Sequence, residues 1–425
     1  MYKISLYSLL ILIICFNPIL SQNKIDITEL YSKFAKKENR IKFERELKTS
    51  IDTSLSKPLI KENIKLIHKA LNNASLYFIK NDLVEYSIKN IFNNYKTLNN
   101  KLLFRTIQTA YNLYPGKFIN EAEKIYNETN DSFVYSAAAV YLLNSKGYEN
   151  IHTDLINKFG VFKNDPVLLM LEYFLNDNKL NTPPLLDLVK HKFGNNKTIV
   201  YSFQRKDRNF PGITLIKAPN GKFVRNEDST IFYIPHLALS ANGFPGFLKN
   251  GNTAQGIYSV QKYYYSPTEE IGPSPVLLSR IPYEIEPAKF YHGGINKNRW
   301  NIDDYKNLLP DSWKDYLPVY ESYYAGLSGR RVIVAHGNAD DPAFYNDKRF
   351  SPFTPTQGCL SSIEVWNDKG RLIKSDQIKL MNAFFSTGEL YGYLIVVDIN
   401  DIKEPVTIEE LLPVINQYEL NSDTN

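Results

Sequence analysis

A cysteine and an upstream histidine in the last third of the chain have the residue types of a nucleophile and its base. Cys359 lies in the stretch TPTQGCLSS, and His336 ends the apolar run VIVA. A thiol nucleophile needs a base to take its proton and backbone N–H groups to stabilise the developing oxyanion. One loop, residues 338–358, is long enough to bring the two side chains together. The pattern therefore predicts a cysteine nucleophile with His336 as its base.

The glycine that precedes the cysteine adds to this prediction. Gly358 allows a tight turn, so we expect the N–H groups of Gly358 and Cys359 to point at one oxyanion. The alternatives are that Cys359 is a buried small hydrophobe and that His336 only hydrogen-bonds its own loop. His292, in KFYHGG, competes as base, but its context is that of a loop, so we expect it to line the groove.

The beginning of the chain is typical of a signal peptide, residues 1–21, with the apolar run ISLYSLLILIICF and a cleavage site after Ser21. An uncleaved membrane anchor is the alternative, but the run is short for a membrane span. Ile14 stands where a lipoprotein box has a small residue, and cleavage after Ser21 removes Cys15. Cys359 is then the only cysteine, so no disulfide contributes to the fold. We expect a protein of the periplasm or cell envelope.

Composition restricts the class of protein. The chain has 425 residues, 43% hydrophobic and 22% charged, which are values of an ordinary globular protein of two or three domains. The net charge of +5 is small, and Lys and Arg form no dense block, so we expect no nucleic-acid partner.

The elements that must position these residues change in type near residue 190. Between residues 22 and 180 the apolar residues recur at helical spacing, as in LVEYSIKNIFNNY, which predicts a stack of helical hairpins or a bundle. A linker follows at 181–196, then a mainly β domain at 197–403 and a C-terminal tail at 404–425. The expected strands include TIVYSFQR, GIYSVQKYYY, RRVIVAHG and YGYLIVVDI, and the best helix of this half is SDQIKLMNAFF.

The helical half shows no catalytic pattern. His68 and His152 have no partners at metal-ligand spacing, so we interpret both as ordinary surface or packing residues. This half is a candidate for docking a protein partner.

Three blocks of the second half resemble the L,D-transpeptidase catalytic domain (the YkuD-type fold). VIVAHG followed by TPTQGCLSS is similar to the family's His-Gly and Ser/Thr-x-Gly-Cys signature, NGNTAQGIYSV to its upstream segment, and LMNAFFSTGELYGYLIVVDI to its closing helix and strand. The resemblance covers residues 197–400 and implies a β-sandwich for that half, and it does not extend to the helical half.

The resemblance also implies an activity on peptidoglycan stem peptides. Cys359 would form a thioester at the third residue of a tetrapeptide stem with loss of D-alanine, and an amine of a second stem or water would then take the acyl group. No cofactor and no metal is implied. The catalytic residues would be Cys359, His336 and Gly358. Substrate-binding residues would come from the motif and its surroundings: Gly337, Thr356, Gln357, Ser361, Tyr258, His292 and Arg331.

The sequence departs from the family pattern at four places. Gln357 replaces a basic residue before the Gly-Cys pair, Ser361 stands where Arg or Asn is usual, Ala254 replaces a proline, and the His-to-Cys loop is long. Arg330, Arg331 or Arg349 are expected to supply the missing charge. The alternatives are an inactive relative that binds stem peptides, or an L,D-carboxypeptidase or endopeptidase. A papain-like order, with Cys before His, does not fit this chain.

Overall fold

The computed structural model describes residues 24–422 apart from 148, 149, 161, 163, 177–180, 194 and 195. The predicted signal peptide therefore lies outside the described residues. The helices of the first half are α1 (Lys37–Leu55), α2 (Ile64–Leu76), α3 (Asp82–Asn93), α4 (Asn100–Leu113), α5 (Ile119–Glu128), α6 (Ser132–Lys146), α7 (Ile151–Phe159), α8 (Pro166–Asn176) and α9 (Leu185–Lys190).

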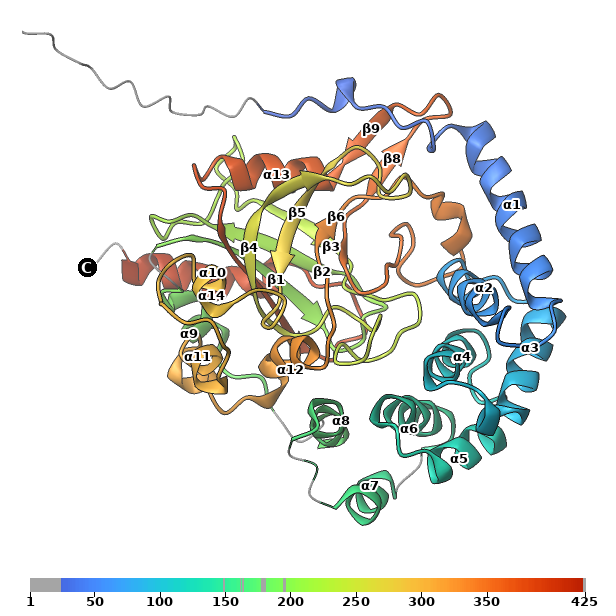
Figure 1. Cartoon of the computed structure of the whole chain (residues 1–425). Helices are drawn as coiled ribbons and strands as arrows, with labels where there is room; N and C mark the ends of the chain where they lie inside the picture. The colour runs from blue at the N-terminus through green and yellow to red at the C-terminus, as the bar shows by residue number, and fades with distance from the viewer. Residues whose placement is uncertain are drawn as a thin grey trace, which may run out of the picture.

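The helices α1 to α8 form an arc of two layers around one side of the β domain (Figure 1). Helices α2, α4, α6 and α8 form the inner layer, and each packs against the next member of that layer. Helices α1, α3, α5 and α7 lie outside them. The Asp131 carboxylate caps α6 by accepting from the N–H of Val134, as expected for an N-cap residue. The predicted helical first half is confirmed.

The second half is mainly β, as predicted, and its largest element is an eight-stranded mixed sheet in the order β3-β2-β1-β10-β4-β5-β6-β7. Two pairs in it, β1 with β10 and β6 with β7, are parallel. Strands β8 and β9 form a separate antiparallel pair. The strands are β1 (Thr198–Arg205), β2 (Gly212–Lys217), β3 (Tyr233–His236), β4 (Gly256–Tyr265), β5 (Pro275–Arg280), β6 (Ala335–His336), β7 (Leu360–Ser361), β8 (Glu364–Trp366), β9 (Leu372–Ser375) and β10 (Gly392–Asn400).

Helices cover both faces of this sheet. Side chains of β1, β4 and β10 alternate between two apolar clusters, as the period of a strand requires. One cluster includes residues of α9 and α14, and the other includes residues of α13. The helices of this half are α10 (Pro287–Phe290), α11 (Ile302–Lys306), α12 (Glu321–Leu327), α13 (Asp376–Phe385) and α14 (Ile408–Ser422).

The two edges of the large sheet meet at one point. Leu237, directly after β3, forms an antiparallel bridge with Ser361 of β7. The N–H of each residue donates to the carbonyl of the other, at 2.9 and 2.8 Å. The bridge pairs with the edge of β7 that faces away from β6, so the segment that follows Cys359 is held on both sides.

Three expectations differ from the structure. The expected linker contains α9, which packs against α14, and the expected tail contains the whole of α14. The expected strand RRVIVAHG is reduced to β6, because Val332 has a positive φ of 59° and its N–H bonds the Glu284 carboxylate.

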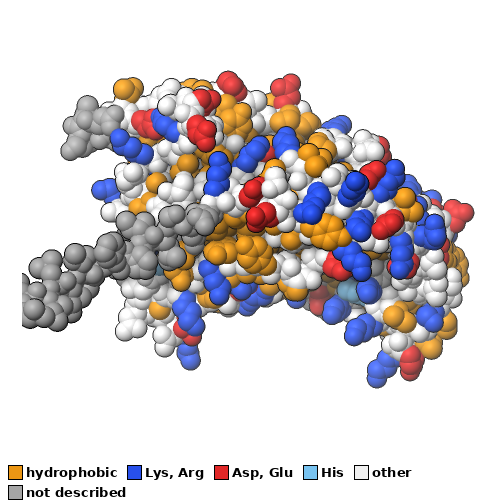
Figure 2. Space-filling view, turned by 90° about the horizontal axis from the view of Figure 1, so that it is seen from above, with side chains coloured by type: hydrophobic (Ala, Val, Ile, Leu, Met, Phe, Trp, Pro, Cys, Tyr) orange, Lys and Arg blue, Asp and Glu red, His pale blue; other side chains and the backbone are white. Residues whose placement is uncertain are grey.

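The surface seen from the top of Figure 1 mixes basic and acidic side chains with apolar ones (Figure 2). Among the described residues, no helix is long and apolar enough to span a membrane.

Candidate functional site

The parallel pair β6–β7 brings the histidine and cysteine segments together. Its register aligns Ala335 with Leu360 and His336 with Ser361. The N–H of Leu360 donates to the carbonyl of Val334 at 2.9 Å, so Cys359 lies beside residue 334, two positions before the level of His336. The loop 338–358 therefore returns the chain as expected, although no hydrogen bond joins the two side chains among the described residues.

Cys359 is half-buried, and its Sγ lies 3.6 Å from the carbonyl oxygen of Val332 as a weak donor. Burial raises the pKa of the Cys359 thiol above its usual value, while the N–H of Val334 and the charge of Arg330 act in the opposite direction. The thiol is therefore protonated near neutral pH. A nucleophilic role requires a base at the moment of attack.

His336 is only 3% exposed. Its Nδ1 bonds the carbonyl oxygen of Gly337 at 2.7 Å, and because a carbonyl only accepts, Nδ1 carries the proton. Nε2 then holds the lone pair, and it has no hydrogen-bond partner in the described part of the chain. Burial lowers the pKa of His336, against the opposing effect of the Gly337 carbonyl. The imidazole is therefore neutral and able to accept a proton.

The turn before the cysteine is held by Thr356. Its Oγ1 accepts from the N–H of Gly358 at 2.9 Å and donates to the carbonyl of Cys359 at 2.8 Å. The Gly358 amide is thus engaged within the turn. The Cys359 N–H has no partner among the described residues, so it is the amide of this pair that remains available to an oxyanion.

Gly358 is required by its surroundings. Its φ is +109°, and a Cβ at this position would lie 1.9 Å from Nη2 of Arg330 and 2.4 Å from the carbonyl oxygen of Gly251. Arg330 is itself buried and donates to the carbonyls of Gly246 and Gly251, the latter at 2.6 Å. The Arg330 guanidinium thus packs directly against the turn that carries the cysteine.

Other predicted site residues lie around this turn. Ser361 Oγ accepts from the side-chain amide of Asn338 at 2.7 Å. Gln357 and Arg331 are exposed and line a cavity of about 500 Å³. Tyr258 is fully buried, and its hydroxyl donates to the carbonyl of Ala254 at 2.6 Å, so it packs inside the domain rather than on a groove surface.

His292, the competing base, is not brought to the cysteine. Its Nε2 lies 2.9 Å from the carbonyl of Gly392 and 3.1 Å from Oγ of Ser259, which places it against β4 and β10.

Glu364 is a buried carboxyl that the sequence reasoning missed. A Cβ on Gly337 would lie 2.1 Å from the carboxyl carbon of Glu364, so the glycine after His336 makes room for it. The carboxyl accepts from the hydroxyls of Ser274 and Ser375 at 2.5 and 2.7 Å. Burial nevertheless raises the pKa of Glu364 to about 8. No signal in the sequence distinguishes this glutamate, because its partners come from three separate segments.

The helical half supports both loops of the site. From α1, Arg40 donates to the carbonyls of Ala339 and Asp340, at 2.9 and 3.2 Å. From α4, Gln108 donates to the carbonyl of Lys249 at 2.6 Å. The first contact holds the loop after His336, and the second holds the loop that lies against Arg330 and Gly358.

No group of His, Cys, Asp and Glu in the described part of the chain could hold a metal ion. In comparisons with known proteins, no family model matches the chain, and neither a curated protein nor a solved structure matches it significantly.

Proposed function

We propose that the protein is an exported cysteine transpeptidase that acts on peptidoglycan stem peptides through a thioester at Cys359. The observation that carries the proposal is the β6–β7 pair, which brings a neutral imidazole and a protonated thiol to adjoining strands in the order His, then Cys. The resemblance of three sequence blocks to the L,D-transpeptidase catalytic domain supplies the substrate class. We also propose that the large sheet corresponds to the β-sandwich of that family.

The first half-reaction requires the Cys359 side chain to turn from Val332 toward His336. Sγ attacks the carbonyl carbon of the third stem residue while Nε2 of His336 takes the thiol proton. The N–H of Cys359 then donates to the oxyanion. The C–N bond breaks, the imidazolium returns the proton to the leaving amine, and D-alanine departs from a thioester.

The second half-reaction repeats these roles. An amine of a second stem attacks the thioester carbonyl and His336 takes a proton from it. The C–S bond breaks, and the thiolate regains its proton from the imidazolium. Water in place of the amine gives the carboxypeptidase or endopeptidase outcome. Delivery to the periplasm or cell envelope fits this substrate.

A second candidate, a stem-peptide binding module without catalysis, is favoured by one observation. The thiol has a raised pKa and bonds Val332, not His336. Such a module would keep the groove and leave the cysteine unreactive.

Covalent labelling tests the proposal. We expect intact-mass spectrometry of the mature protein incubated with a carbapenem to show one drug adduct, and none on Cys359→Ala. His336→Gln should slow the adduct at least about a hundredfold, because general-base catalysis contributes on this order. His292→Gln is the matched control and should label like the wild type. If the folded wild type forms no adduct and its thiol stays inert to iodoacetamide, the binding-module function replaces this one.

A further inference from the structure

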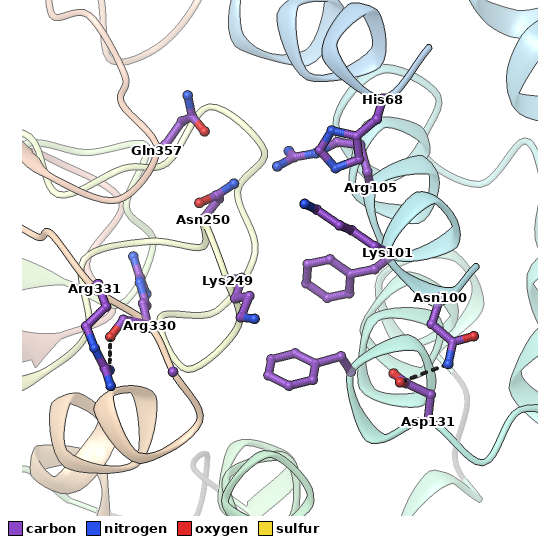
Figure 3. Close-up of a pocket in the computed structure, with 13 residues that line it drawn as sticks. His68, Asn100, Lys101, Arg105, Asp131, Lys249, Asn250, Arg330, Arg331 and Gln357 are labelled. Carbon is purple, nitrogen blue, oxygen red and sulfur yellow. Dashed lines mark hydrogen bonds between the residues drawn. The ribbon is translucent and has the colours of Figure 1, made fainter. Parts of the chain in front are cut away.

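The cavity of about 500 Å³ lies between the two halves of the molecule, next to the cysteine turn (Figure 3). On one side stand side chains of α2, α4 and the start of α6. On the other stand residues 249–250, 329–331 and Gln357. Each half therefore supplies one wall.

The lining carries an excess of positive charge. Its cationic side chains are those of Lys101, Arg105, Lys249, Arg330 and Arg331, and its one acidic residue is Asp131. The Asp131 carboxylate accepts from the N–H of Val134 through Oδ1 and from the amide of Asn100 through Oδ2, the latter at 3.0 Å. One carboxylate against five cationic side chains leaves the lining with a net positive charge.

Arg105 is the most unusual of these cations. It is 5% exposed, its Nε is buried without a hydrogen-bond partner, and its guanidinium forms no ion pair with any described residue. Burial lowers the pKa of Arg105 to about 10, which leaves it charged at neutral pH. A buried, unpaired cation is costly, and the cost falls when an anion binds it.

The unpaired guanidinium points into the cavity. In Figure 3 its head lies beside the imidazole of His68, with the ammonium of Lys101 next to both. Burial and the charges of Arg105 and Lys101 lower the pKa of His68 to about 4. Its neutral ring can therefore donate one hydrogen bond to an anion that sits between the two cations. His68, interpreted from the sequence as an ordinary surface or packing residue, lines this cavity beside the two cations.

The cavity borders the turn that carries the thiol, although Cys359 itself is not among the residues that line it. Gln357 lines it two residues before Cys359, and Arg330 both lines it and lies close enough for its charge to act on the thiol. This position beside the cysteine turn is the basis for relating the basic cluster to a ligand at Cys359.

We infer that His68, Lys101 and Arg105 form a carboxylate-binding subsite for the acidic peptide whose reacting carbonyl lies at Cys359. A planar guanidinium with a neighbouring ammonium matches the geometry of a carboxylate. The helical half then takes part in substrate recognition and supplies the charge that is missing at Gln357. The identity of the peptide rests on the proposed function, whereas the anion site does not.

Calorimetry with the mature Cys359→Ala chain tests the subsite without turnover. The probes are a tetrapeptide stem with free carboxylates and the same peptide with every carboxylate amidated. We expect the free acid to bind more tightly, and Arg105→Gln to weaken it about tenfold or more, because it removes a buried charge-assisted bond. Lys101→Gln, at an exposed side chain, should weaken binding about threefold. Arg105→Lys should restore part of the loss.

Lys89→Gln is the control, since it removes the same charge from an exposed position on α3 outside the cavity lining. If Lys101→Gln and Lys89→Gln bind the free acid equally, in chains that unfold at the wild-type temperature, the subsite does not exist. This comparison remains decisive if Arg105→Gln fails to fold.

A second readout locates the bound anion. We expect the free-acid peptide to raise the pKa of His68 in an imidazole NMR titration, and the amidated peptide to leave it unchanged. An unshifted His68 under saturating free acid overturns the inference. The two proposals fail separately: a His68 shift in a chain that never forms a carbapenem adduct supports the subsite alone, and an adduct without charge-dependent binding supports the thioester chemistry alone.

Discussion

At the scale of single residues, the site depends on positions where a side chain would not fit. Gly358 stands over the Arg330 guanidinium, and Gly337 stands beside the Glu364 carboxyl. The sequence predicted that a glycine before the cysteine matters, because a tight turn needs one. It could not predict the reason found here, since Arg330 and Gly251 come from segments far along the chain. Nor could it predict that the Gly358 amide bonds Thr356.

Gly358→Ala should destabilise the protein and expose the thiol. The added Cβ overlaps Arg330 and Gly251 at a φ of +109°, so we expect a loss of about 2–4 kcal/mol in the free energy of unfolding. Urea denaturation measures the loss, and iodoacetamide labelling measures the thiol. Gly388→Ala separates the two causes, because Gly388 also has a positive φ, of 78°, but no atom within 4 Å of the added Cβ. It should cost only about 1 kcal/mol. Equal losses in both variants would contradict the role given to Arg330.

The buried carboxyl of Glu364 predicts a pH-dependent stability. Its pKa is raised to about 8 in the fold, against about 4.3 in the unfolded chain. Between these values the native state holds a proton that the unfolded state has released, so stability falls as pH rises from about 4.3 to about 8 and then levels. Asp340, whose pKa burial also raises to about 8, acts in the same direction.

Glu364→Gln should therefore remove part of this slope. Glu321, whose pKa burial raises to about 7, acts in the same direction over this range. We expect the wild type to lose about 3 kcal/mol per buried carboxyl between pH 5 and pH 8, and Glu364→Gln to lose roughly two-thirds of the wild-type total. Urea denaturation at the two pH values provides the comparison, with the exposed Glu269→Gln as control. If the unfolding free energy of the wild type and of Glu364→Gln changes equally between the two pH values, the raised pKa of Glu364 is contradicted.

At the scale of elements, two of the strands and one helix of the second half were predictable from the sequence. TIVYSFQR coincides with β1, GIYSVQKYYY coincides with β4, and SDQIKLMNAFF contains α13. The segment RRVIVAHG was also expected as a strand, yet only Ala335–His336 pairs. The backbone of Val332 turns instead toward the Glu284 carboxylate. That contact joins two segments distant in the chain, and local apolar pattern carries no information on it.

The hydrogen bonds from α1 to the loop that follows His336 give a prediction at this scale. Arg40→Ala removes the bonds to the carbonyls of Ala339 and Asp340. We expect a loss of about 1–2 kcal/mol in unfolding free energy and slower carbapenem labelling, because the loop that follows His336 loses its support. Arg45→Ala, at an exposed position on the same helix, should leave both measurements near the wild type. Unchanged labelling in Arg40→Ala would mean that α1 does not position this loop.

At the scale of the whole molecule, the helical half and the β domain share one core. Phe244, Phe247 and Leu248, from the loop before β4, belong to the same apolar cluster as the inner helices. Phe244 contacts the rings of Phe104 and Tyr111 of α4. The spacing of apolar residues correctly divided the chain into an α half and a β half. It could not show that the second half inserts side chains into the first.

A shared core predicts that the two halves unfold together. Phe244→Ala should lower the unfolding free energy by about 3–5 kcal/mol. The loss should appear equally in the helical signal by far-UV circular dichroism and in the packing of the β domain by near-UV circular dichroism. Tyr233→Ala, on an exposed side chain of β3, is the control. Two separate transitions in the wild type would refute the shared core.

The contacts of residues 24–32 have a consequence for the order of assembly. Ile25 exchanges two hydrogen bonds with the Asn382 side chain, at 2.9 and 3.2 Å, and the N–H of Ser32 bonds the carbonyl of Gly370 at 2.9 Å. The first described segment thus has partners that lie more than 330 residues later in the chain. Residues 24–32 can therefore dock only after Gly370 and Asn382 have been synthesised, so this part of the fold cannot form while the helical half alone has left the ribosome.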